Sequence, residues 1–335
     1  MGLTTASMGL VPTHAAIGAL SPILLVSLRF VQGVALGGEW AGAVLIAVEH
    51  GAQDARGRNA SWTQVGPAVG TLLATACIAA ITYLLSSDAF LAWGWRLPFL
   101  TSVLLVGFGL WIRQGVDETP LFQELEQSGG KARTPVSDVV RHWWRRLLIA
   151  GGVRVGTDVL YALVYVFALT YVTTVLNLSR TLALTAIMIA TPVNAVMIPL
   201  FAILSDRVGR RIVYGSGAAL AIVFAFAFFL LVDTARPTLI VFAAIVGVVL
   251  HSAMYGPQAA FVVEQFPTRV RYAGSSLAYT LAGIVGGGFA PLIMAGLLRA
   301  YHTNTAVSLY VAASLGVTCA ALLSSRETAN LPLEE

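Results

Sequence analysis

The sequence predicts an all-α polytopic membrane protein, because charged residues are scarce and long apolar runs recur along the whole chain. Of its 335 residues, 57% are hydrophobic and 11% are charged, whereas a soluble domain has about 25% charged residues. A bilayer-spanning helix needs roughly 20 mostly apolar residues. Runs of that kind lie near residues 22–49, 61–85, 93–114, 147–172, 181–204, 212–232, 237–262, 273–298 and 305–324. We therefore expect nine complete membrane-spanning helices, whereas the apolar start of the chain, residues 1–10, covers only about half a bilayer.

Charged loops indicate the orientation of these helices and the division of the chain. By the positive-inside rule, loops rich in arginine and lysine are cytoplasmic. Such residues gather on alternate loops, at Arg56, Arg58, Arg113, Lys131, Arg133, Arg141, Arg145, Arg146, Arg207, Arg210, Arg211, Arg269, Arg271 and Arg326. We predict a multi-pass plasma-membrane protein, monomeric and with a cytoplasmic C-terminus. Its parts would be an incomplete N-terminal bundle (1–116), a cytoplasmic linker (117–146), a six-helix bundle (147–326) and a tail (327–335).

An internal repeat supports two related bundles. The segment Val48-Glu49-His50, followed by Arg56-Gly57-Arg58, resembles Val263-Glu264-Gln265 followed by Arg269-Val270-Arg271. Parallel repeats of this kind occur in transporters, although two short matches can also arise by chance. If the repeat is real, the turn at 205–211 has its counterpart before residue 1, so we expect the N-terminal bundle to lack about two helices.

Several motifs together resemble one family of membrane proteins. They are Arg29-Phe30-Val31-Gln32-Gly33 with Gly37-Gly38-Glu39-Trp40, Trp93-Gly94-Trp95-Arg96-Leu97-Pro98-Phe99, Glu118-Thr119-Pro120, the turn 206–211, and Tyr255-Gly256-Pro257-Gln258 through Glu264 to Arg271. With them the chain resembles the metabolite:proton symporter family of the major facilitator superfamily, which includes shikimate, dicarboxylate and osmolyte carriers. The resemblance implies a fold of two helical bundles and proton-coupled symport of a small organic solute by alternating access, without a cofactor.

Two charged residues of the first predicted span are candidates for proton coupling, because a charge inside a bilayer is costly and usually functional. Glu39 lies near the middle of the span among glycines, so we expect a buried carboxylate that binds a proton, or else a structural one. For Arg29, the resemblance implies a role in proton coupling, with a structural anchor as the alternative.

The span 147–172 carries a second charged pair. Arg154 and Asp158 stand at i and i+4, which predicts an ion pair. Either the two only neutralise each other, or Asp158 couples protons and Arg154 binds a substrate carboxylate. Tyr161 and Tyr165 continue the same four-residue stride and would line the substrate pathway.

Further candidates for substrate binding lie on other spans. His251 and Tyr255 share a face beside Gly256-Pro257, where a buried packing histidine is the alternative. Trp40, with Trp62, could offer an aromatic face to a zwitterionic osmolyte.

The turn at 206–211 is a candidate conformational latch. It contains Asp206, Arg207, Gly209, Arg210 and Arg211, and the glycine permits a tight reversal. The predicted neighbours of this turn are Glu264, Arg269 and Arg271. The resemblance implies the latch function, and the alternative is a set of solvated loop charges.

Other classes of function fit the sequence poorly. The five histidines show no metal-ligand spacing, and there is no nucleotide-binding G-x-x-x-x-G-K-[ST] motif, so we do not expect an enzyme. The basic loops follow membrane topology rather than nucleic-acid binding. The expected partners are a small organic solute, protons and the lipid bilayer. A carboxylate is the favoured solute because of Arg154, and the open alternatives are a proline or betaine symporter and a transport-inactive remnant.

Overall fold

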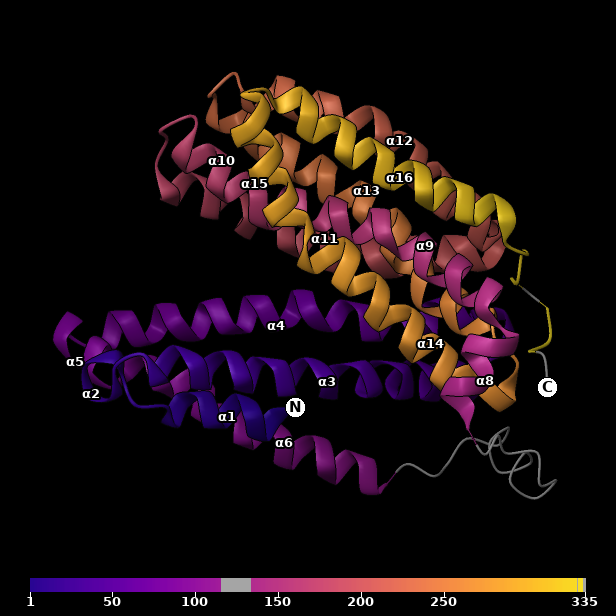
Figure 1. Cartoon of the computed structure of the whole chain (residues 1–335), viewed down its shortest axis with the longest axis horizontal. Coiled ribbons are helices and arrows are strands. Elements are labelled where there is room, and N and C mark those ends of the chain that lie inside the picture. Colours follow the sequence, from indigo (N-terminus) through magenta and orange to yellow (C-terminus); the bar gives the residue numbers. More distant parts are fainter. Residues whose placement is uncertain (116–133, 330, 334–335) are drawn as a thin grey trace. The chain divides into compact units, whose positions relative to one another are not determined.

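The computed structural model describes residues 1–115, 134–329 and 331–333, and this part of the chain is built from α-helices (Figure 1). Within these residues, nine helices are long and apolar enough to cross a membrane, as the sequence predicts. Residues 117–133 of the predicted linker lie outside the described residues. This part of the sequence contains Glu118-Thr119-Pro120, Lys131 and Arg133.

The chain forms two compact units. One contains Met1–Trp40 with Val69–Thr119, and the other contains Ala41–Ala68 with Pro120–Glu335. The two long helices α3 (Leu20–Glu49) and α4 (Arg56–Leu84) therefore each contribute one part to each unit.

The first unit is held together by apolar helices and one arginine. Besides parts of α3 and α4, it contains α1 (Gly2–Leu10), α2 (His14–Ile17), α5 (Ser87–Ala92), a 3-10 turn (Gly94–Arg96) and α6 (Leu97–Gln114). Helix α1 packs on α6, and Arg96 Nη1 donates to the backbone oxygens of Gly9 at 2.7 Å and Val11 at 2.8 Å. These bonds satisfy carbonyl groups that the end of α1 leaves without helical partners.

The second unit holds six further spans. It contains a 3-10 turn (Gln53–Ala55), α8 (Pro135–His142), α9 (Trp144–Ala162), α10 (Ala168–Thr174), α11 (Arg180–Val208), α12 (Arg210–Val232), α13 (Pro237–Glu264), α14 (Thr268–Ala282), α15 (Ala290–Tyr301) and α16 (Asn304–Ser324). Two spans contain π-helical segments, since Leu163–Phe167 joins α9 to α10 and Gly283–Gly288 joins α14 to α15. Such segments are frequent at functional sites.

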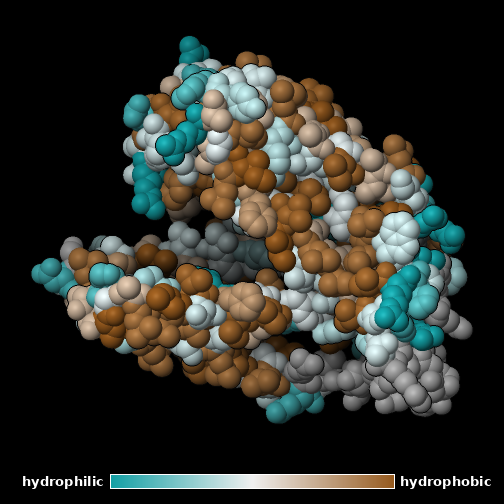
Figure 2. All heavy atoms as spheres, viewed as in Figure 1, coloured by the Kyte–Doolittle hydropathy of each residue, from teal (hydrophilic) through white to brown (hydrophobic). Residues whose placement is uncertain are grey.

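Small residues let the helices of this unit approach closely, as is common inside membranes. A Cβ added at Gly256 of α13 would lie 2.5 Å from the backbone oxygen of Ile198 in α11. Apolar side chains cover most of the face seen in Figure 2, and hydrophilic residues gather towards the ends of the helices. This distribution suits a chain whose long helices are surrounded by lipid.

Candidate functional site

The predicted ion pair of α9 is present inside the membrane-spanning part of the second unit. Arg154 Nε lies 2.8 Å from Asp158 Oδ2, and each residue is only 8% exposed. The Arg154 guanidinium also covers the ring of Tyr279, with its Cζ 3.2 Å from the ring centroid, and Nη1 donates to the Tyr279 backbone oxygen. The pair thus joins α9 to the end of α14.

Glycines of the π-helical segment 283–288 form the surface against which the pair packs. A Cβ at Gly283 would lie 3.2 Å from Arg154 Nη2, and one at Gly286 would lie 3.1 Å from Asp158 Cβ. At Gly287 the added atom would be 3.8 Å from Asp158 Oδ2. Larger residues at these positions would therefore press on the two charged groups. Sequence spacing did not indicate this contact, although the glycines stand one to two turns after Tyr279.

An aromatic row, formed by Tyr161, Tyr165, His251 and Tyr255, extends from the pair. Tyr161 stacks on Tyr165 with centroids 4.4 Å apart, and its ring lies 5.5 Å from that of His251, which stacks on Tyr255 at 4.8 Å. Tyr255 in turn interacts with Tyr279 and lies near Arg154. The structure therefore brings together six site residues that were predicted on two different spans.

Buried polar groups surround this cluster. His251 Nδ1 lies 3.2 Å from Asn194 Nδ2, and the same amide donates to Ser252 at 2.8 Å. Near Asp158, the Thr157 hydroxyl is 2.7 Å from the hydroxyl of Tyr214, a residue that sequence spacing did not single out. These bonds hold the helices of the site in one arrangement.

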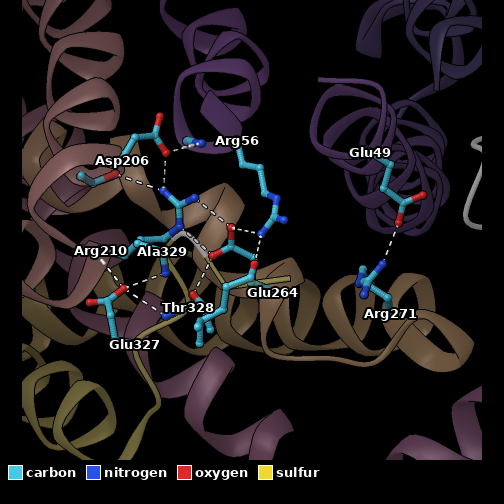
Figure 3. A network of polar contacts seen from close by, with 12 residues as sticks. Glu49, Arg56, Asp206, Arg210, Glu264, Arg271, Glu327, Thr328 and Ala329 are labelled. Atoms are coloured by element: carbon cyan, nitrogen blue, oxygen red, sulfur yellow. Dashed lines mark hydrogen bonds and ion pairs between the residues drawn. The ribbon is translucent and has the colours of Figure 1, made fainter. Parts of the chain in front are cut away.

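A second site, the charged cluster, lies at one end of this unit and consists of Arg56, Asp206, Arg210, Glu264, Glu327 and Thr328 (Figure 3). Its centre is a forked ion pair, in which Arg210 Nε lies 2.6 Å from Glu264 Oε2 and Nη2 lies 2.8 Å from Oε1. Arg210 Nη1 contacts Asp206 Oδ1 at 3.0 Å. Since both side chains of the fork are 1% exposed, the interaction is little screened by solvent.

Asp206 also binds the beginning of α4. Its two carboxylate oxygens accept from the backbone N–H groups of Gly57 and Arg58, each at 2.8 Å. A carboxylate at a helix N-terminus satisfies free donors and complements the helix dipole. A Cβ at position 57 would lie 2.7 Å from Asp206 Oδ1 and 3.0 Å from the backbone oxygen of Ala202, so a larger residue would displace the carboxylate from the start of α4.

The segment after α16 completes the cluster. Glu327 accepts from the backbone N–H groups of Arg210 and Arg211, each at 3.0 Å, and Thr328 Oγ1 donates to Glu264 at 2.6 Å. Partial burial disfavours the charged carboxylate of Glu327, but its bonds with backbone N–H groups outweigh this effect and hold its pKa below the ordinary value. Glu327 was not predicted as a site residue, although the pair Glu327-Thr328 repeats the dipeptide of Glu118-Thr119.

Two crossed ion pairs join the two segments of the predicted repeat. Glu49 of the first copy pairs with Arg271 of the second at 2.9 Å, and Glu264 of the second copy lies 3.8 Å from Arg56 of the first. Each segment thus supplies a carboxylate to an arginine of the other, but the two arginines stand at different positions of the repeat.

Among the other predicted latch residues, Arg271 pairs with Glu49, and the side chains of three more arginines lie outside the charged cluster. Arg207 is exposed, Arg269 pairs with Asp138 at 3.1 Å, and the Arg211 guanidinium approaches the backbone oxygen of Leu323 at 3.4 Å. The predicted reversal at Gly209 is present, with φ of +104°, a region that favours glycine.

The prediction that Glu39 is buried is wrong. Glu39 and Arg29 are both exposed on α3, where Arg29 Nη1 donates to Gln32 at 2.9 Å. Depth within an apolar run does not bury a side chain unless other helices face it, and only 6% of the most apolar part of α3 is buried. Trp40 is 8% exposed, whereas Trp62 is 65% exposed.

Comparison with known proteins identifies the family of this chain. The family model of the Major Facilitator Superfamily matches residues 1–291 and 159–332. The chain belongs to the Major Facilitator Superfamily. It is therefore a multi-pass membrane protein of a transporter family, and not an enzyme.

Individual relatives are named as metabolite carriers. The inner membrane metabolite transport protein YhjE of Escherichia coli (strain K12) is 35% identical, with 98% of this chain and 76% of the relative covered. The shikimate transporter of the same strain is 37% identical, with 93% and 72% covered. The glycine betaine/proline/ectoine/pipecolic acid transporter OusA of Dickeya dadantii (strain 3937) is 31% identical, with 100% and 68% covered.

Solved structures share the fold. The proton:xylose symporter XylE bound to 6-bromo-6-deoxy-D-glucose aligns with a TM-score of 0.73 and 18% identity, over 100% of this chain and 79% of XylE.

Proposed function

We propose that this chain carries out proton-coupled symport of a small carboxylate metabolite across the inner membrane, by alternating access and with a cytoplasmic C-terminus. The observation that carries this proposal is the ion pair of Arg154 and Asp158 inside a membrane-spanning helix. Charged residues at such positions are costly and mark ion or substrate pathways. Guanidinium groups bind carboxylates in a forked geometry, so Arg154 suits an anionic solute.

The geometry of the pair suggests how proton and solute are coupled. Asp158 engages Arg154 Nε, and the ring of Tyr279 covers one face of the guanidinium. A proton on Asp158 removes the negative charge that attracts the guanidinium, so Arg154 can bind the carboxylate of the solute instead. Binding of one ligand then favours the other, and this coupling is reciprocal.

The aromatic row supplies the neutral part of the proposed pathway. Tyr161 and Tyr165 come from the span of α9, and His251 and Tyr255 come from α13. Their rings would contact the carbon skeleton of the solute, and the hydroxyl groups would bind its polar substituents. Trp40 is a further proposed contact.

The charged cluster is the proposed conformational latch. Its fork between Arg210 and Glu264 and its contact from Asp206 to the start of α4 form a connected set of strong polar bonds (Figure 3). Alternating access would break and re-form such a set. Proton coupling by Arg29 and Glu39 stays a prediction, which the variant E39Q tests.

Uptake of labelled solutes into cells expressing the chain tests the proposal. Shikimate, α-ketoglutarate, citrate and betaine are compared with and without an uncoupler, in the wild type, R154Q, D158N and the control R299Q, which alters an exposed arginine. We expect uncoupler-sensitive carboxylate uptake that R154Q abolishes. D158N should retain exchange but lose accumulation, because its side chain cannot bind and release a proton. Uncoupler-sensitive carboxylate uptake that R154Q leaves unchanged would refute the proposed role of Arg154.

The same assay is run with the reading frame extended upstream, because the chain spans 72% of the length of the shikimate transporter that it matches. Uptake by the extended form alone would assign the activity to the longer protein. No uptake of any of these solutes by either form would remove the support for their symport.

An osmolyte symporter is the second candidate, and the aromatic row is the observation that favours it. Stacked tyrosines such as Tyr161 and Tyr165 offer ring faces to a quaternary ammonium group. Betaine uptake that exceeds carboxylate uptake, and that Y161A abolishes, would select this alternative.

A further inference from the structure

Helix α8 is too short to cross the membrane and is fixed to the second unit. Eight residues extend about 12 Å at 1.5 Å per residue, and the helix directly precedes the span that begins with α9. It packs on α14, where Val139 is fully buried and Asp138 pairs with Arg269 at 3.1 Å. This face of α8 is therefore occupied by the protein itself.

Another face of α8 is open and apolar. Val136 is 56% exposed and Val140 is 52% exposed, one helical turn apart. Beside them lies an open groove of about 530 Å³, lined by Thr134, Pro135, Val136, Ser137, Val140 and Arg141. The groove thus combines an apolar floor with a guanidinium group at its edge.

Basic and aromatic residues continue from this groove into the first turn of α9. Arg141 and Arg145 are exposed, and neither makes an ion pair with any described residue. The Arg145 guanidinium lies 5.4 Å from the ring centroid of Trp144, which is itself 49% exposed. Exposed tryptophan beside arginine is typical of the boundary between lipid and water.

We propose that α8 lies in the membrane interface and binds an anionic phospholipid, with an acyl chain along Val136 and Val140 and the phosphate group at Arg141 and Arg145. Interfacial helices combine an apolar face with basic residues that attract anionic lipid. The open apolar groove fits the hydrocarbon part of such a lipid. The two arginines, which have no carboxylate partner among the described residues, complement its charge. This site involves no residue of the proposed solute pathway or of the charged cluster.

Lipid binding to the purified full chain in neutral detergent tests this proposal. Fluorescent phosphatidylglycerol and phosphatidylcholine are titrated into the wild type, R141Q/R145Q and R236Q/R299Q. The last variant removes the same charge from two exposed arginines elsewhere, Arg236 just before α13 and Arg299 in the last turn of α15. Because a basic residue near an anionic surface contributes about 1 kcal/mol, R141Q/R145Q should weaken phosphatidylglycerol binding about 30-fold. The control variant should change it less than threefold.

Two more variants and a soluble competitor distinguish a lipid site from general attraction between opposite charges. R141K/R145K keeps the charge and should retain most of the phosphatidylglycerol binding. V136S/V140S should weaken the binding of both lipids. Gel filtration verifies that each variant is folded. Soluble glycerol phosphate should not compete at the concentrations at which the lipid binds. Equal losses in R141Q/R145Q and the control, equal affinity for both lipids, or competition by glycerol phosphate would each overturn the proposal.

Discussion

Replacing Glu264 by glutamine tests how far the charged cluster stabilises the second unit. Glu264 receives both arms of the Arg210 fork, at 2.6 and 2.8 Å, and a hydrogen bond from Thr328 at 2.6 Å. The substitution keeps the shape of the side chain but removes its charge, so the buried guanidinium loses its principal counter-ion.

The expected loss follows from the remaining contacts. Removing one partner of a buried ion pair costs about 3–5 kcal/mol. Because Asp206 still contacts Arg210 at 3.0 Å, we expect the lower limit, about 3 kcal/mol. For a domain of 150–250 residues this corresponds to a decrease in Tm of about 6–12 °C.

Thermal unfolding in detergent, arranged as a double-mutant cycle, measures this loss. The cycle compares E264Q, R210Q and E264Q/R210Q, with D54N as the control for an exposed carboxylate of the same unit. We expect the double variant to lose about 2 kcal/mol less than the sum of the single losses, and D54N to stay within about 0.5 kcal/mol. Losses that add within about 0.5 kcal/mol would refute the coupling inferred from the geometry.

Three further substitutions and one control test other contacts through the stability of the fold. G256A should lower Tm by several degrees, because its Cβ would meet a backbone oxygen of α11 at 2.5 Å. The control is G215A, where an added Cβ meets no other atom within 4 Å. It should leave Tm unchanged or raise it, since alanine favours a helix by about 1 kcal/mol over glycine. Equal changes in Tm for G256A and G215A would contradict the close approach of α13 to α11. Because the pKa of Glu327 is lowered in the folded state, its contribution is complete above the ordinary value of 4.5 and is lost as pH falls through the folded pKa. In E327Q the free energy of unfolding should therefore fall less steeply as the pH is lowered below 4.5. A pH profile identical to that of the wild type would show that Glu327 does not contribute to the acid sensitivity of the fold. Y171F removes the hydrogen bond to Asp233 at 2.7 Å and should cost about 1.5 kcal/mol, and no decrease in Tm would show that the bond does not stabilise the fold.

Periodicity and hydropathy were sufficient to predict the membrane-spanning helices and the contacts between residues of one helix. The apolar runs predict nine spans because the lipid requires that length, and the interval of four residues fixes the pairing of Arg154 with Asp158. The turn at Gly209 was predictable for a similar local reason, since its φ of +104° disfavours other residues.

Contacts between helices could not be predicted in this way. Whether Glu39 is buried depends on which helices face α3, and the apolar run around it carries no information on that point. The approach of Gly286 to Asp158 and the bonds from Glu327 to α12 join residues more than 100 positions apart. The one long-range contact between charged groups that the sequence analysis predicted and the structure contains is that of Glu264 with the turn at 206–211, seen as the fork with Arg210.

The crossed ion pairs also bear on how the protein is made. Glu49 and Arg271 are 222 residues apart in the chain, and synthesis adds roughly 5–20 residues per second. About 10–45 s therefore separate the translation of the two partners. During this interval the end of α3 carries a carboxylate without its final partner. Because such a charge does not enter the bilayer readily, it keeps the end of α3 at the aqueous surface until α14 has been synthesised.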